Sequence, residues 1–181
     1  MATAFTHGFV ASLLAPLAPR NIRRVPLLIV LVTLSILPDI DVLAFRFGIP
    51  YSHPMGHRGF THSFAFSLLS AALSTFVFYR QARPLSRSWF GLLALLFVAS
   101  ASHGILDAFT DAGLGVGFFL PFDETRYFFP WRPLATSPIG IASFFNEDVS
   151  SILINEFVWV WAPTGILAAI LWGTRRLSRN A

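Results

Sequence analysis

The chain contains no cysteine and no lysine. The lack of cysteine excludes disulfides, thiolate metal sites and cysteine nucleophiles. Charge of either sign is scarce, because charged residues make up 12% of the 181 residues, about half the fraction of a typical soluble domain. All 13 basic residues are arginines, and they form no dense basic patch interleaved with aromatic residues. We therefore expect no nucleic-acid partner.

Apolar residues dominate instead, at 55% of the chain and a mean hydropathy of +0.65. A helix that crosses a bilayer needs about 20 mostly apolar residues. Five apolar segments follow one another without a repeat or a linker: Ala2–Ala18, Val25–Phe47, Phe60–Tyr79, Ser88–Phe109 and Ile152–Gly173. The last four are candidate spans, and the first is short enough to be re-entrant or half-inserted. We predict a single domain over residues 1–181, an all-α integral membrane helical bundle with four or five membrane-embedded helices.

Arginines near the segment ends predict the orientation, because basic residues concentrate on the cytoplasmic side. With an outside N-terminus, nine arginines lie in the cytoplasm: Arg20, Arg23, Arg24, Arg80, Arg83, Arg87, Arg175, Arg176 and Arg179. Four lie outside: Arg46, Arg58, Arg126 and Arg132. We therefore predict a multi-pass membrane protein in contact with membrane lipids. The inverted orientation is the minority interpretation.

Residues 110–151 break the apolar pattern with many glycines, prolines and aromatics. This composition is typical of an irregular region at the headgroup boundary. We favour a connector over a lid for this region, because loop-like composition is its main feature.

Four short polar clusters interrupt the apolar segments, and they share imidazole and carboxylate groups. They are His7, Pro38-Asp39-Ile40-Asp41, residues 57–63 and residues 103–111. In the predicted orientation every cluster reaches the outer face of the membrane. Imidazole and carboxylate bind divalent metals, and ionisable groups in apolar segments need a compensating role. We therefore predict a metal site there, over a purely structural polar network.

Spacing tests the individual pairs. His103 and Asp107 are four apart on a helix and share a face, which suits a metal ligand pair or a polar pair that packs two helices. Asp39 and Asp41 follow Pro38, which we expect to end a helix. Two residues apart, they bind the same ion only if the backbone turns. The alternative is a solvated helix end, which the helix dipole disfavours for carboxylates.

The string His57-Arg58-Gly59-Phe60-Thr61-His62-Ser63 combines several roles. His57 and His62 reach a common site only if His57 lies in the loop and His62 in the first helical turn. We expect Thr61 to cap the following helix. Arg58 binds either an anionic substrate oxygen or a lipid headgroup. His53 in a Ser-His-Pro loop is expected to be solvated.

These motifs in this order resemble the YdjM-type inner-membrane metal-dependent hydrolase family. The resemblance spans residues 7–113, and the His-Arg-Gly-Phe-Thr-His-Ser string carries most of it. The pattern is also similar, more distantly, to zinc-dependent phospholipase C and single-strand nuclease families. The resemblance implies Thr110 and Gly113 as supports and assigns no role to Asp111. It implies a shared polar set, which we take as the metal ligands: His7, Asp39, Asp41, His57, His62, His103 and Asp107.

The predicted function is hydrolysis of a phosphoester or lipid substrate at the extracytoplasmic membrane surface by a metal-activated water. The cofactor is a divalent metal, with zinc preferred and one to three ions, because the ligands mix imidazole and carboxylate. Arg58 and Asp41 are the predicted catalytic residues, and Arg58 would hold phosphate oxygens. Two alternatives stay open: a scaffold or regulatory protein with a structural metal, and a metal transporter. A transporter would need ligands on both sides of the bilayer midplane.

Overall fold

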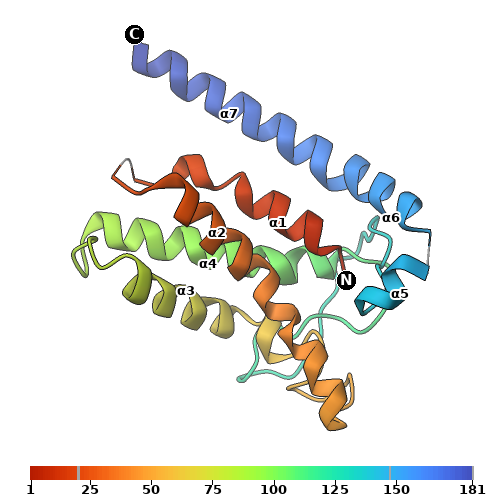
Figure 1. Ribbon diagram of the computed structural model, residues 1–181. Helices are drawn as coiled ribbons and strands as arrows, with labels where there is room; N and C mark the ends of the chain where they lie inside the picture. Colours follow the sequence, from red (N-terminus) through yellow and green to blue (C-terminus); the bar gives the residue numbers. More distant parts are fainter. Residues whose placement is uncertain (20, 147, 181) are drawn as a thin grey trace.

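A computed structural model describes residues 1–19, 21–146 and 148–180 of the chain. Within this part the protein is helical and has no β-strand; its β-pairing is limited to isolated bridges, Thr110 with Leu134 and Val116 with Tyr127. Figure 1 shows the helices in order: α1 (Ala4–Ser12), α2 (Arg24–Ile36), α3 (Phe64–Phe78), α4 (Arg87–Ala108), α5 (Ile141–Asn146), α6 (Val149–Glu156) and α7 (Ala162–Asn180). Short 3₁₀ helices are η1 (Ala15–Leu17), η2 (Leu37–Phe47) and η3 (Phe60–His62), and η4 (Phe157–Trp161) is a π-helical turn.

Three helical stretches are long and apolar enough to cross a bilayer: Arg24–Phe47, Arg87–Ala108 and Val149–Thr174. Two shorter apolar stretches, Ala4–Leu17 and Phe64–Phe78, accompany them. The predicted helical membrane bundle is confirmed. The third predicted segment is shorter than expected as a helix, because the chain turns through η3 before Ser63 caps α3 by accepting a hydrogen bond from the backbone N–H of Phe66. The prediction that Thr61 is this cap was wrong.

The α-helix α2 ends at Ile36, just before Pro38, as expected, but the chain keeps a helical course beyond it. The chain tightens from α2 into η2 and continues to Phe47, where Gly48 ends it with a left-handed backbone (φ +73°). Proline is tolerated here because it lies at the start of the new 3₁₀ helix, where its missing N–H has no helical partner to lose. Asp39 and Asp41 therefore lie on one continuous helical stretch and point in different directions.

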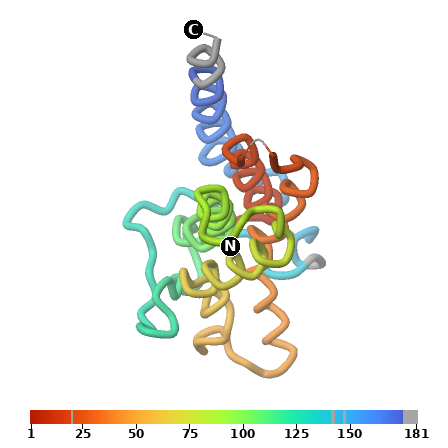
Figure 2. Tube along the Cα trace, turned by 90° about the vertical axis from the view of Figure 1, so that its left-hand side faces the viewer, coloured from red at the N-terminus to blue at the C-terminus, as the bar shows by residue number. Residues whose placement is uncertain are grey.

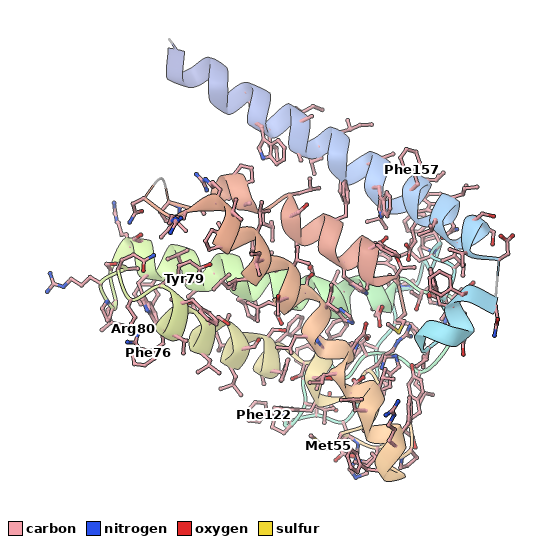
Figure 3. All side chains as sticks on the ribbon, in the orientation of Figure 1. Met55, Phe76, Tyr79, Arg80, Phe122 and Phe157 are labelled. Carbon is pink, nitrogen blue, oxygen red and sulfur yellow. The ribbon has the colours of Figure 1, made fainter. Side chains whose placement is uncertain are left out.

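The core lies where α1, α2 and α4 pack together around buried leucines and alanines, among them Leu27, Leu31, Leu92 and Leu96. The α3–α4 contact relies on small side chains. Ser67, Ala71 and Ser74 are buried on α3, and Ser70 Oγ lies 3.5 Å from Ser100 Oγ on α4. Small residues let membrane helices approach closely. Exposed aromatics such as Phe76 and Phe122, labelled in Figure 3, lie on the outside of this bundle.

The C-terminal stretch contacts the bundle mainly through η4 and α6, and Figure 2 shows α7 extending away from the other helices. Within Val149–Thr174, only 6% of the most apolar 18-residue stretch is buried inside the protein. Arg20 lies outside the described residues, as do the side chains of Arg175, Arg176 and Arg179. The orientation in the membrane stays a prediction.

Candidate metal centre

Four side chains, three of them fully buried and one partly buried, converge where η2, η3 and the end of α4 meet. Asp39, His62, His103 and Asp107 each direct one ligand atom to a common point, and these atoms lie within 4.8 Å of one another. His62 Nε2 and His103 Nε2 are 3.1 Å apart. Asp39 Oδ1 lies 3.3 Å from His103 Nε2, and Asp107 Oδ2 lies 3.7 Å from His62 Nε2. We call these four residues the inner group.

Each imidazole of the inner group is oriented by a second hydrogen bond. His103 Nδ1 lies 2.7 Å from the backbone carbonyl oxygen of Ser35, which can only accept, so Nδ1 carries the proton and Nε2 a lone pair. His62 Nδ1 lies 3.1 Å from Thr61 Oγ1, whose own proton goes to Asp41 Oδ2, so Nδ1 donates to this hydroxyl oxygen and Nε2 of the neutral ring keeps a lone pair. Two facing lone pairs repel unless a proton or a cation lies between them.

The inner group fits a divalent metal by two further features. Asp39 Oδ1 and Asp107 Oδ2 are buried and have no hydrogen-bond partner among the described residues, and such atoms are costly to bury unsatisfied. A tetrahedral zinc ion with Zn–N and Zn–O distances of ~2.0 Å holds its ligand atoms ~3.3 Å apart. The observed separations, from 3.1 to 4.0 Å for the five closest pairs, are near that value.

His62 also shows how a proton can take this position. Burial by itself lowers the pKa of its ring, but the carboxylates of Asp107 and Asp41 outweigh burial and raise that pKa to about 9. Without a metal the ring therefore holds an extra proton at neutral pH. A bound cation would replace this proton.

Asp41 and His57 form an outer layer around the inner group. Asp41 Oδ1 lies 2.8 Å from His57 Nδ1, and its Oδ2 accepts from Thr61 Oγ1 at 2.7 Å and from the Arg58 backbone N–H at 3.2 Å. Asp41, His57 and His62 are themselves close enough to hold an ion. Both carboxylate oxygens of Asp41 are already hydrogen-bonded, so this arrangement resembles the carboxylate–histidine pairs that orient metal ligands from behind.

Arg58 is fully buried, although the sequence had suggested either a substrate contact or a headgroup contact. Its Nε lies 3.2 Å from Asp107 Oδ2, and its Nη atoms donate to Thr110 Oγ1 and to the carbonyls of Ala112 and Leu114. The headgroup contact is excluded by this burial. Its backbone φ of +60° is rare for a residue with a side chain and costs about 1–3 kcal/mol. Strained backbone conformations of this kind cluster at functional sites.

The remaining predicted residues occupy different places. His7 is buried, stacks on His103 with ring centroids 3.7 Å apart, and directs Nε2 toward Asp107 Oδ1 at 3.6 Å. Its two ring nitrogens have no hydrogen-bond partner among the described residues, so it borders the inner group and can join it. Asp111 is exposed, and its side chain accepts hydrogen bonds from the backbone N–H and the hydroxyl of Thr136, away from the inner group. His53 is exposed, as expected.

The supporting residues implied by the family resemblance lie beside Arg58. Thr110 Oγ1 accepts from Arg58 and donates to the carbonyl of Asp107. Gly113 has a φ of +86°, and a Cβ there would lie 3.2 Å from Arg58 Nη1. A side chain at position 113 would therefore press against the guanidinium group.

Two partners were missed by the sequence analysis. The Ser35 carbonyl that orients His103 is a backbone atom, and no residue type marks it in a sequence. Glu156 is buried in the last apolar segment and accepts hydrogen bonds from the N–H and hydroxyl of Thr3 and from the hydroxyl of Thr6. A lone acid within an apolar segment could have been flagged. Glu156 therefore links α6 to the start of α1, the helix that also carries His7.

An apolar cavity of about 360 Å³ opens beside the inner group, between the start of α1, η2 and α5. Asp39 forms part of its wall and is the inner-group residue with an exposed side chain, at 13%, whereas His62, His103 and Asp107 are at 0%. Asp39 therefore connects the buried polar centre to an accessible space.

Comparisons with known proteins agree with this architecture. The family model described as YdjM inner membrane protein matches residues 1–179. The inner membrane protein YbcI of Escherichia coli (strain K12) is 35% identical over 177 residues, which cover 97% of this chain and all of that protein. No solved structure matches. The family model covers nearly the whole of this chain, which folds as an all-helical bundle with membrane-length helices. The chain therefore belongs to the YdjM inner membrane protein family.

Proposed function

We propose that the protein is a membrane-bound metal-dependent hydrolase that cleaves a phosphoester of a lipid at the extracytoplasmic surface. One observation carries the proposal: the inner group gathers two orphaned carboxylate oxygens and two facing imidazole nitrogens beside an open apolar cavity. A structural metal site has no need of access. An accessible site with convergent polar groups is the usual form of an active site.

Asp39, His62, His103 and Asp107 would hold the ion, with His7 at its border. Zinc suits this mixture of neutral imidazole and carboxylate ligands. When bound, such an ion lowers the pKa of a water molecule and polarises the scissile phosphoester. The chain's own part is to keep these four side chains in place and to admit a substrate on the side of Asp39.

The surrounding residues then act as positioning groups. The Thr61 hydroxyl, itself bonded to Asp41, and the Ser35 carbonyl each accept from Nδ1 of one imidazole, so that Nε2 faces the centre. Arg58 neutralises part of the charge on Asp107 and ties it to the loop at residues 110–114. Three of the five guanidinium N–H groups donate hydrogen bonds to this loop, while Nε faces Asp107. We accordingly favour a positioning role for Arg58 over the direct phosphate contact that its sequence suggested.

The distribution of polar groups weighs against the transporter alternative. Among the described residues, both groups that could hold an ion share His62 and lie at the same end of the helices. A transport path would continue through the membrane with further polar side chains. The scaffold alternative, in which the metal only stabilises the bundle, accounts for the ligands but leaves the adjoining cavity without a purpose.

The test combines metal loading with turnover. Purified protein in nanodiscs is stripped with a chelator, reloaded with Zn²⁺ and assayed for headgroup or phosphate release from phospholipids and soluble phosphate esters. Turnover should require the ion, and His103→Ala should lose more than the about 10- to 100-fold typical of outer partners. His53→Ala, an exposed histidine, is the matched control and should keep its activity. Folded, fully loaded protein without turnover of any of these substrates would favour the scaffold alternative.

A further inference from the structure

The cavity beside Asp39 is lined almost wholly by apolar side chains. Ala4 and Phe5 come from α1, Val42 from η2, and Phe144 and Phe145 from α5. Its volume of about 360 Å³ falls in the range of roughly 300–1,000 Å³ typical of small-molecule sites. None of its lining residues has a basic side chain, although Met1, which carries the α-amino group, is among them.

We propose that this cavity binds one acyl chain of a glycerophospholipid, whose phosphate then lies against the inner group. That the lipid is the substrate rests on the proposed function; that the cavity holds an acyl chain does not. The commitment to a phospholipid follows from the surroundings, because bilayer lipids are the apolar molecules present at high concentration around membrane-length helices.

The position of Asp39 gives the cavity its direction. Its Oδ1 belongs to the inner group, while the same side chain forms part of the cavity wall. A chain lying along the apolar part therefore has its polar end next to the candidate ion. Because the wall has no arginine side chain, the cations available to the phosphate are the candidate ion and the α-amino group of Met1.

Two aromatic side chains of α5 border the cavity, Phe144 and Phe145. Phe145 is 72% exposed, and Phe144 packs against Phe5 with ring centroids 6.5 Å apart. Aromatic residues at this level suit the boundary between headgroups and hydrocarbon. A lipid can thus enter sideways from the bilayer, without its chain crossing water.

A second apolar groove supplies a matched control. It has a volume of about 670 Å³, is bordered by Phe60, Ala65, Leu68 and Phe122, and includes none of the inner-group residues. Because Ala4 and Ala65 each line one of the two spaces, Ala4→Trp and Ala65→Trp place the same bulk in each of them.

The probe is a phosphatidylglycerol with a photoreactive diazirine in one acyl chain, added to the whole protein in nanodiscs. Crosslinked peptides are mapped by mass spectrometry, with and without excess unlabelled phosphatidylglycerol. We expect competable labelling at the start of α1 and in α5. Ala4→Trp should reduce this labelling by at least about tenfold, because a filled cavity resists further packing. Ala65→Trp should leave it unchanged.

Two further arms separate this inference from the proposed function. His103→Ala should lose metal and turnover but keep the competable labelling, since it does not line the cavity. Ala4→Trp should keep its metal, which shows that it is folded, and lose turnover if the lipid is the substrate. Labelling that resists competition, or that Ala4→Trp and Ala65→Trp affect equally, would show only annular lipid and would overturn the inference.

Discussion

The substitution Asp41→Asn separates a metal ligand from a residue that orients ligands. Asparagine keeps the shape of aspartate but replaces one acceptor oxygen with a donor NH₂ group. In the unaltered protein, Asp41 Oδ1 accepts from His57 Nδ1 at 2.8 Å. Asp41 Oδ2 accepts from Thr61 Oγ1 at 2.7 Å and lies 3.1 Å from His62 Nδ1. Whichever oxygen is replaced, one histidine faces a donor and must turn or change its tautomer.

The expected magnitude follows from this outer position. Loss of such a partner typically weakens metal binding about 10- to 100-fold, which is ~1.4–2.7 kcal/mol. Zinc titration against a competing chelator should therefore show weaker binding with unchanged stoichiometry at saturation. His103→Ala, which removes an inner-group nitrogen, should lower the stoichiometry itself.

Asp111→Asn is the control, because Asp111 is exposed and, among the described residues, its side chain bonds only Thr136. Its zinc affinity should equal that of the unaltered protein. If Asp41→Asn loses the ion as completely as His103→Ala, Asp41 is a direct ligand, as the sequence analysis predicted. If its affinity is unchanged, the orienting role is refuted.

Four further outcomes are expected. Because the pKa of His62 is about 9 instead of 6.5, zinc must displace a proton from this ring below pH 9. The zinc affinity should therefore rise from pH 6.5 to 9 and then level off. Calorimetry in buffers of different ionisation enthalpy should detect the released proton. Arg58→Lys keeps the charge but loses the fork that holds Thr110 and the 112–114 carbonyls, so metal affinity and thermal stability in detergent should both fall, whereas Arg132→Lys should change neither. Glu156→Ala strips three buried hydrogen bonds and should lower the unfolding free energy by about 2 kcal/mol or more, with exposed Ser150→Ala as the comparison. Gln81→Cys adds a lone thiol to a cysteine-free chain, and resistance to an impermeant thiol reagent in intact cells would support the predicted orientation, whereas ready labelling would reverse it.

Much of the architecture could be predicted because apolar length and polar interruption are local properties. The apolar segments marked where helices lie, and the four-residue spacing of His103 and Asp107 placed both on one face of α4. The sequence analysis required His57 in the loop and His62 in the first helical turn for a shared site; the structure has His57 before η3 and His62 at the end of η3, ahead of α3. The pair at Asp39 and Asp41 was understood only in part. Their spacing implied divergent directions, and η2 does turn one toward the inner group and the other toward His57.

The rest depends on tertiary contacts that leave no pattern in the chain. Pro38 marks the end of the α-helix, but proline alone does not reveal that a 3₁₀ helix continues to Phe47. Arg58 reads equally well as an exposed or a buried side chain, and only the folded loop at residues 110–114 supplies its acceptors. The carbonyl of Ser35 has no signature at all. By contrast, Glu156 was visible as an acid within an apolar segment, and its omission was a failure of interpretation.

The most direct test of the account is the metal content of the purified protein and its single variants. Each protein is incubated with Zn²⁺, dialysed and analysed by mass spectrometry of the metal. The account predicts one ion for the inner group in the unaltered protein and in His53→Ala, and a marked loss in each of the inner-group variants: Asp39→Ala, His62→Ala, His103→Ala and Asp107→Ala. Equal metal content in all five variants, with each shown to be folded, would contradict the existence of this centre.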